Sequence, residues 1–183
     1  MINICESIKI LINQTSSKTE QAIARIMFNN SMTISTAESC TGGLISSRLT
    51  DIAGSSLYIK ENFVTYANEA KTSILGVSAE TIEQHGAVSG ECALEMVEGL
   101  ISKTNCDVAM ATTGIAGPSG SENKPVGLLY VAVKNKYSTR VKKFELNPKY
   151  SRKTMKFMFS QMALEFLLEF LKENYVADEI VIK

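Results

Sequence analysis

The chain has 183 residues, of which 45% are hydrophobic and 21% are charged, and its 19 basic and 19 acidic residues leave no net charge. This length suits one domain with a substantial core, and the composition argues against disordered, collagen-like and coiled-coil proteins. A chain without net positive charge offers no electrostatic footprint for nucleic acid, so we expect no nucleic-acid partner.

The four cysteines and the single histidine predict no metal site. No two of the four cysteines have the two-residue spacing typical of zinc ligands; they are Cys5, Cys40, Cys92 and Cys106. The single histidine, His85, cannot complete a zinc site with them. The N-terminus lacks the basic and apolar regions of a signal peptide, and no apolar stretch approaches the roughly 20 residues of a membrane span. We therefore expect a cytoplasmic protein with no metal and no membrane contact.

Helices and strands alternate along the first half of the chain. In order, the predicted elements are a helix over 17–29, a strand over 32–37, a helix over 44–49, a strand over 62–66 and a short helix over 68–76. Ser17 and Glu20 have capping-box spacing in the first helix. Asn68 is the expected N-cap of the short helix, which Gly76 ends.

The second half predicts two helices capped by Ser78 and Ser89, and then a largely β region. Its remaining elements are an apolar strand over 106–111, a hairpin of 126–134 with 139–146, and a long helix over 151–173. No repeat or linker interrupts the alternation. We predict one domain over residues 1–183, with a core of about 17–173, folded as a three-layer α/β/α unit around a mixed sheet. Ligands of such sheets bind beyond the carboxyl ends of the strands.

Two loops rich in glycine and hydroxyl groups could bind a ligand. Ser39-Cys40-Thr41-Gly42-Gly43 lies between a strand and a helix, where backbone N–H groups favour anions and glycines allow a phosphate to approach. Thr112-Thr113-Gly114-Ile115-Ala116-Gly117-Pro118 follows the apolar strand and could direct donors at a ligand or an oxyanion. The first loop is equally readable as a tight turn, whereas the hydroxyl and glycine content of the second favours a functional role over a turn; both readings stay open.

Lys71 is a candidate general base. In the first turn of the short helix the helix dipole disfavours a cation, and burial would favour the neutral amine that a hydroxyl nucleophile needs. The alternative is a solvated surface lysine. Ser55 and Ser56 are eligible nucleophiles that could also be turn formers, and His85 is more simply the end of a helix than a catalytic base.

Six segments that carry these residues occur in a recognisable order: Thr36–Gly43, Asp51–Ser56, Phe63–Lys71, Gln84–Ser89, Thr113–Pro118 and Lys124–Gly127. Together they resemble the CinA C-terminal domain family of competence/damage-inducible proteins, which includes nicotinamide-mononucleotide amidases. The resemblance covers about residues 17–170. It implies hydrolysis of the carboxamide of nicotinamide mononucleotide (NMN) to nicotinate mononucleotide and ammonia, by a Ser–Lys pair without metal or cofactor.

The resemblance also implies site residues. By motif position the nucleophile is Ser56 and the base is Lys71, with Tyr66 and Thr113 in supporting roles. We further expect the substrate to contact the Ser39–Gly43 helix start, which would hold its phosphate, together with Gly114 and Arg152; the residues of that start are Ser39, Cys40, Thr41, Gly42 and Gly43.

One segment departs from the family pattern. Many relatives carry Gly-Asp-Arg before the last helix, whereas this chain has Leu146-Asn147-Pro148-Lys149-Tyr150, with Arg152 after it. Either Arg152 or Lys149 would replace the family arginine, and the two are not equivalent, because arginine presents a planar fork and lysine a point charge.

The resemblance further predicts a homo-oligomer, with a dimer favoured. The chain is expected to be a stand-alone form without the N-terminal domain of full-length CinA proteins, and so without the pyrophosphatase activity of that domain. Two alternatives to the enzyme stay open: a non-catalytic nucleotide-binding module of the same fold, and an interaction protein of competence or DNA-damage responses.

Overall fold

A mixed five-stranded sheet organises the chain, and the computed structural model describes residues 18–121 and 123–175. The strands are β1 (Ile34–Glu38), β2 (Ile59–Val64), β3 (Val108–Gly114), β4 (Leu128–Asn135) and β5 (Thr139–Glu145), in the spatial order β2-β1-β3-β4-β5. β1 runs parallel to both of its neighbours, and β4 runs antiparallel to β3 and β5. The carboxyl ends of β1, β2 and β3 therefore lie at one edge of the sheet.

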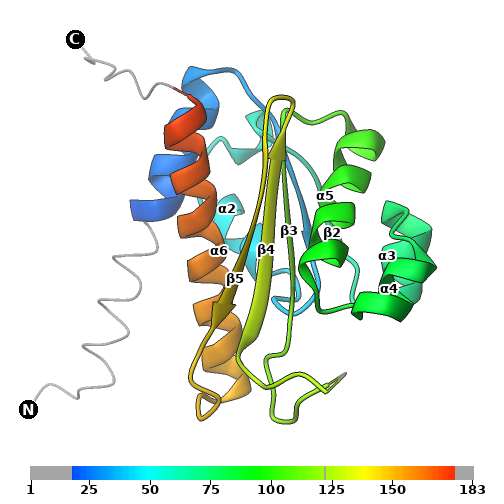
Figure 1. Cartoon of the computed structure of the whole chain (residues 1–183). Coiled ribbons are helices and arrows are strands. Elements are labelled where there is room, and N and C mark those ends of the chain that lie inside the picture. The colour runs from blue at the N-terminus through cyan, green and yellow to red at the C-terminus, as the bar shows by residue number, and fades with distance from the viewer. Residues whose placement is uncertain (1–17, 122, 176–183) are drawn as a thin grey trace, which may run out of the picture.

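Helices cover both faces of the sheet, which confirms the predicted three-layer α/β/α fold (Figure 1). The helix at 18–29, α2 (Leu44–Thr50) and α6 (Arg152–Asn174) lie on one face. On the other lie α3 (Asn68–Leu75), α4 (Ala79–His85) and α5 (Gly90–Thr104). A short 3-10 helix, η1 (Ser55–Leu57), precedes β2.

The two faces of the central strands differ in side-chain size. On β3, Val108 and Met110 pack toward α6, whereas Ala109 and Ala111 pack toward α5. Successive side chains of a strand point to opposite faces, so this alternation assigns bulky residues to one side and methyl groups to the other. The small residues let α5 lie close to the sheet, and both layers are buried.

Local signals predicted most helix ends. Ser78 and Ser89 cap α4 and α5, since their side chains accept hydrogen bonds from the backbone N–H groups of Glu80 and Cys92. The prediction for Asn68 was wrong, because the N-cap of α3 is Ala67 and Asn68 is the first helical residue. Ser17 lies outside the described residues.

β3 is longer than predicted and shortens the loop after it. The strand continues to Gly114, so Thr112 and Thr113 belong to the sheet rather than to a turn. Thr112 pairs with Glu38 of β1, and Thr113 and Gly114 pair with Tyr130 and Leu129 of β4. Pairing on both sides extends the strand past the point where its apolar residues end.

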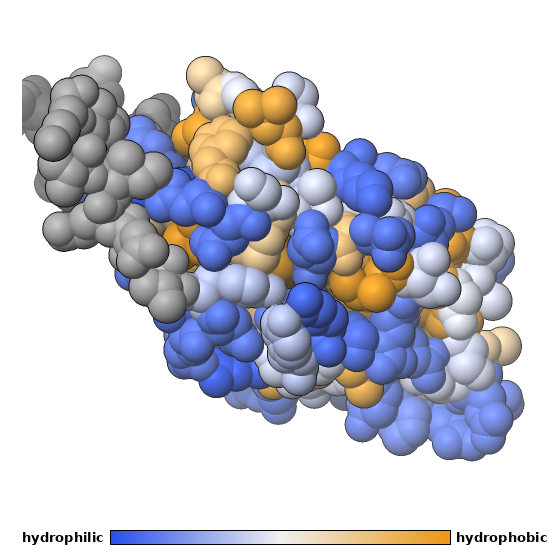
Figure 2. Space-filling view, turned by 90° about the horizontal axis from the view of Figure 1, so that it is seen from above, coloured by the Kyte–Doolittle hydropathy of each residue, from blue (hydrophilic) through white to orange (hydrophobic). Residues whose placement is uncertain are grey.

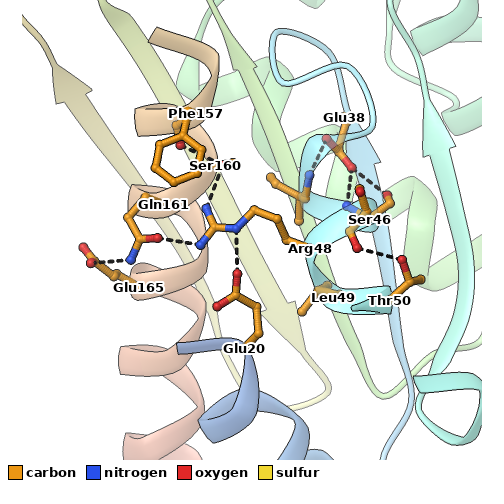
Figure 3. A network of polar contacts seen from close by, with 12 residues as sticks. Glu20, Glu38, Ser46, Arg48, Leu49, Thr50, Phe157, Ser160, Gln161 and Glu165 are labelled. Carbon is orange, nitrogen blue, oxygen red and sulfur yellow. Dashed lines mark hydrogen bonds and ion pairs between the residues drawn. The ribbon is translucent and has the colours of Figure 1, made fainter. Parts of the chain in front are cut away.

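A buried arginine joins the three helices of one face (Figure 3). Arg48 of α2 lies 2.6 Å from a carboxylate oxygen of Glu20 in the first helix, and both side chains are almost completely buried. The guanidinium also donates to Ser160 and Gln161 of α6 and lies over the ring of Phe157. These contacts fix α6 against α2, and α6 in turn carries Arg152 as its first residue.

Candidate active site

A cavity of about 250 Å³ lies at the carboxyl ends of β1 and β3. Its walls come from the segments that follow these two strands, the start of α3, the corner between α4 and α5, and the first residue of α6. This is the sheet edge where the strand order predicts a ligand. A larger cavity of about 440 Å³ lies at the opposite edge, beside Asp107 and Tyr137. Figure 2 views that end, where polar and apolar residues are interspersed.

Lys71 and Ser39 meet inside the smaller cavity. Lys71 is only 2% exposed, and its Nζ donates to Ser39 Oγ at 3.3 Å and to the carbonyl oxygens of Thr65 and Tyr66 at 3.2 Å each. Ser39 directly follows β1, and its side chain is also buried. A hydroxyl within hydrogen-bond reach of a buried amine is the arrangement that a Ser–Lys hydrolase requires.

Ser56, the expected nucleophile, lies at the other edge of the sheet. It is exposed in η1, before β2, whose first residue Ile59 pairs with Ile34. Lys71 contacts Thr65, which follows the last residue of β2. The six residues of that strand separate the two ends by roughly 20 Å. The structure thus brings Ser39 to Lys71 in place of Ser56. The rule that ligands bind at the carboxyl ends of strands is the signal that could have pointed to Ser39 instead.

A protein carboxylate already fills the start of α2, where we expected the substrate phosphate. The oxygens of Glu38 accept hydrogen bonds from the backbone N–H groups of Gly43, Ile45 and Ser46 at 2.8–3.1 Å, and from Ser46 Oγ at 2.6 Å (Figure 3). Glu38 is completely buried. Because these three N–H groups are committed to this carboxylate, they are not available to a substrate phosphate.

The Glu38 cap predicts a measurable loss of stability. Glu38→Gln keeps the size of the side chain but turns an amide N–H₂ toward donors that need an acceptor. We expect the free energy of unfolding to fall by about 1.5–3 kcal/mol, the range for hydrogen bonds to charged groups. Urea denaturation measures the change. Glu61→Gln, on an exposed residue of β2, is the matched control and should change stability by less than about 0.5 kcal/mol.

Arg152 and Tyr66 close one side of the cavity. Arg152 Nη2 donates to the hydroxyl oxygen of Tyr66 at 2.8 Å, and Nη1 donates to the carbonyl oxygen of Gly117. Tyr66 is 60% exposed, so this pair stands at the entrance. Of the two basic residues that could replace the family arginine, Arg152 lines the cavity, and Lys149 is not among the lining residues.

Thr113 and Gly114 form the floor at the end of β3. Thr113 Oγ1 donates to the carbonyl oxygen of Ala87 at 2.7 Å, which joins the strand to the corner between α4 and α5. A Cβ at Gly114 would lie 2.6 Å from the carbonyl oxygen of Leu128 and 3.1 Å from Cys40 Sγ. Glycine is therefore required where these three segments meet.

The other residues of the predicted Ser39–Gly43 binding loop do not all face the same cavity. Cys40 lines the cavity, whereas Thr41 is buried and shares a hydrogen bond with Thr112. Gly42 and Gly43, with backbone φ of +62° and +90°, border a separate groove with Lys153 and Lys156. Only Ser39 and Cys40 of the five expected contacts therefore face the candidate active site.

Cys40 is not a competing nucleophile. Burial raises the pKa of its thiol from the ordinary value of 9.0 to about 12, so the reactive thiolate is scarce at neutral pH. At pH 8 the native thiol should react with iodoacetamide about a thousandfold more slowly than in the urea-unfolded chain, as peptide mass spectrometry can measure. Labelling of Cys40 at comparable rates in both states would contradict this environment.

The remaining candidates have structural positions. His85 ends α4, as expected, and its carbonyl oxygen accepts a hydrogen bond from Lys124 Nζ. Within residues 18–121 and 123–175 no three His, Cys, Asp or Glu side chains gather where they could hold a metal ion. In the same part of the chain, no helix combines the length and the apolar character needed to cross a membrane.

Comparison with known proteins is consistent across sequence and structure. Residues 16–171 match the family model described as CinA C-terminal domain. A CinA-like protein of Chlorobium phaeobacteroides is 48% identical over 163 residues, which cover 85% of this chain and 38% of that protein. A CinA-like protein of Shewanella pealeana is 42% identical over 160 residues, which cover 86% of this chain and 38% of that protein. The chain thus spans well under half the length of these relatives.

Solved structures agree with this match. The competence damage-inducible protein A of Klebsiella pneumoniae superimposes with a TM-score of 0.82 at 32% identity, over 86% of this chain and 97% of that one. A competence/damage inducible protein of Agrobacterium tumefaciens gives a TM-score of 0.77 at 40% identity, over 84% of this chain and 95% of that one.

Proposed function

The chain belongs to the CinA C-terminal domain family, and we propose that it is an amidohydrolase that converts NMN to nicotinate mononucleotide and ammonia. The observation that carries the proposal is the contact of 3.3 Å between Lys71 Nζ and Ser39 Oγ inside a cavity at the carboxyl ends of the strands. No metal or cofactor enters the reaction that follows from this pair.

Acylation begins when Ser39 Oγ attacks the amide carbon and the neutral amine of Lys71 takes the hydroxyl proton. The carbonyl oxygen gains negative charge. The backbone N–H of Cys40 directly follows the nucleophile and donates to no main-chain carbonyl among the described residues, so we take it as the candidate to stabilise that charge. The C–N bond then breaks, and the leaving nitrogen takes the proton from Lys71. Ammonia and a Ser39 acyl ester result.

Deacylation repeats these steps with water. Lys71 accepts a proton from the water as its oxygen attacks the ester carbon, and Ser39 Oγ leaves with that proton. The product is a carboxylic acid, which releases its remaining proton to solvent at neutral pH and becomes the carboxylate. Tyr66, whose own carbonyl oxygen accepts a hydrogen bond from Lys71, would help to position the transferred proton.

An anionic substrate suits the charges of the cavity. Arg152 lines it, and none of the lining residues that the structure describes is an aspartate or a glutamate. Toward the described residues, Arg152 uses two of its five N–H groups, for Gly117 and Tyr66, which leaves three for a phosphate. We therefore assign the substrate phosphate to Arg152 rather than to the start of α2.

The decisive experiment measures ammonia and nicotinate mononucleotide released from NMN by the purified chain, with and without EDTA. Equal amounts of both products and no effect of EDTA are expected. Binding of NMN without product would favour a nucleotide-binding module, and no binding would favour an interaction protein. A homodimer, which light scattering tests, and a cytoplasmic location stay predictions from the sequence.

A further inference from the structure

The substrate and product of the proposed reaction differ at one group, and the cavity can distinguish them. A primary carboxamide carries an oxygen that accepts hydrogen bonds and an N–H₂ group that donates them. The carboxylate product carries two oxygens that only accept. A site with donors alone would bind the product at least as well as the substrate, whereas an acceptor at the right place favours the amide.

The Thr113 hydroxyl can act toward a ligand only as a hydrogen-bond acceptor, because it already donates its hydrogen within the protein. Its hydroxyl lies 2.7 Å from the carbonyl oxygen of Ala87, and a carbonyl can only accept, so the hydroxyl hydrogen must point at Ala87. Thr113 is 1% exposed and lines the cavity. The only polar feature that this side chain can offer a ligand is therefore a lone pair of its oxygen, and not a hydrogen.

The segment between α4 and α5, whose Ala87 carbonyl oxygen accepts the hydrogen bond from Thr113, is held in place on both sides of Ala87. Lys124 Nζ donates to the carbonyl oxygens of His85 at 2.6 Å and of Val88 at 2.8 Å, which flank Ala87. Ala87 and Val88 are both part of the cavity wall. Because Lys124 fixes this corner, the Ala87 carbonyl stays within reach of Thr113, and the direction of the hydroxyl hydrogen is maintained.

The other polar side chains that line the cavity either donate or, as for Asn68, Ser119 and Ser121, can turn a donor or an acceptor toward a ligand. Arg152 has only donors, and the lone pair of the Lys71 amine is needed for the Ser39 proton. The hydroxyl oxygen of Tyr66 accepts from Arg152, which leaves its own proton to donate. These groups suit the carbonyl oxygen or the phosphate of a ligand, and they do not distinguish amide from carboxylate. Thr113 does.

We propose that Thr113 Oγ1 accepts a hydrogen bond from the carboxamide N–H₂ of the substrate and thereby selects primary amides over the corresponding carboxylates. The inference rests on the proposed function and adds to it the residue that sets this selectivity. With a carboxylate in place, the Thr113 oxygen faces a second oxygen with no hydrogen between them, which disfavours binding. The hydrolysed product is therefore weakened in the site where it forms.

Binding in a protein that cannot turn over the substrate tests the proposal. On a Ser39→Ala background, calorimetry gives the Kd of NMN and of nicotinate mononucleotide for Thr113, Thr113→Val and Thr113→Ser. The valine variant has the same shape without the hydroxyl, and the serine variant retains the hydroxyl. We expect Thr113→Val to weaken NMN binding about tenfold and to leave product binding unchanged or tighter, because one hydrogen bond is lost to the amide alone. Thr113→Ser should keep the parental ratio.

The outcomes separate this inference from the proposed function. Equal weakening of both ligands by Thr113→Val would overturn the selectivity and assign Thr113 a role in shape. Unchanged Kd values for both ligands in Thr113→Val would overturn it as well. If the parent Ser39→Ala protein binds neither nucleotide while its thermal unfolding is normal, the proposed substrate is wrong and the selectivity for its amide falls with it.

Discussion

Ser39→Ala is expected to lower kcat for NMN hydrolysis by about a thousandfold or more, since loss of a catalytic nucleophile removes the acyl-enzyme route entirely. Ser39 is the hydroxyl in contact with Lys71, and it lies on the buried segment that leaves β1. The substitution removes one oxygen and leaves the Glu38 cap intact. We therefore expect the melting temperature and the Kd of NMN to change little.

Ser56→Ala is the matched comparison, because it makes the same chemical change at the serine that the motif match favoured. Its position before β2 predicts a kcat within about twofold of the parent, as for a surface substitution away from the site. Coupled measurement of ammonia for both variants decides between the two serines. Full activity in Ser39→Ala together with loss in Ser56→Ala would contradict the structural assignment.

Lys71→Met is expected to lower kcat by roughly 10²–10⁴-fold, the range for removal of a general base. Methionine retains most of the aliphatic stem of the buried lysine and lacks the amine. The Thr65 and Tyr66 carbonyls lose a shared donor, so some loss of stability accompanies the loss of rate. Because the change affects proton transfer, we expect KM to change much less than kcat.

Two further variants control the lysine experiment. Lys156→Met removes an amine from the neighbouring groove and should leave kcat within about twofold. Lys71→Arg keeps a positive charge but cannot act as a base, because arginine stays protonated in proteins. We expect it to be as inactive as Lys71→Met. Recovery of more than a tenth of the parental kcat by Lys71→Arg would mean that Lys71 acts through charge and not as a base.

Local sequence signals predicted much of the fold, because hydrophobic period and capping residues act over a few positions. The Ser78 and Ser89 caps are both present. The predicted hairpin is β4 with β5, and the mixed sheet follows from it. The exceptions depend on partners distant in sequence. β3 reaches Gly114 because β1 and β4 pair with its last residues, which nothing in the local pattern of 106–114 signals.

The candidate site likewise combines residues that the sequence predicted with a pairing that only the structure revealed. From sequence alone, Lys71, Tyr66, Thr113 and Arg152 were expected at the site, and the structure places all four around one cavity. The pairing of the lysine with a serine was not readable locally, because it depends on which strand ends share a sheet edge. Ser39 follows the carboxyl end of β1, whereas Ser56 precedes the amino end of β2.

The sequence by itself determined the order of elements, the α/β class and the set of polar residues available for chemistry. Tertiary structure decided which of them meet. The start of α2 had the composition of a phosphate site, yet Glu38, its near neighbour in sequence, folds back and takes the donors. A buried carboxylate needs those hydrogen bonds as much as a phosphate would, and only packing reveals that the protein satisfies them itself.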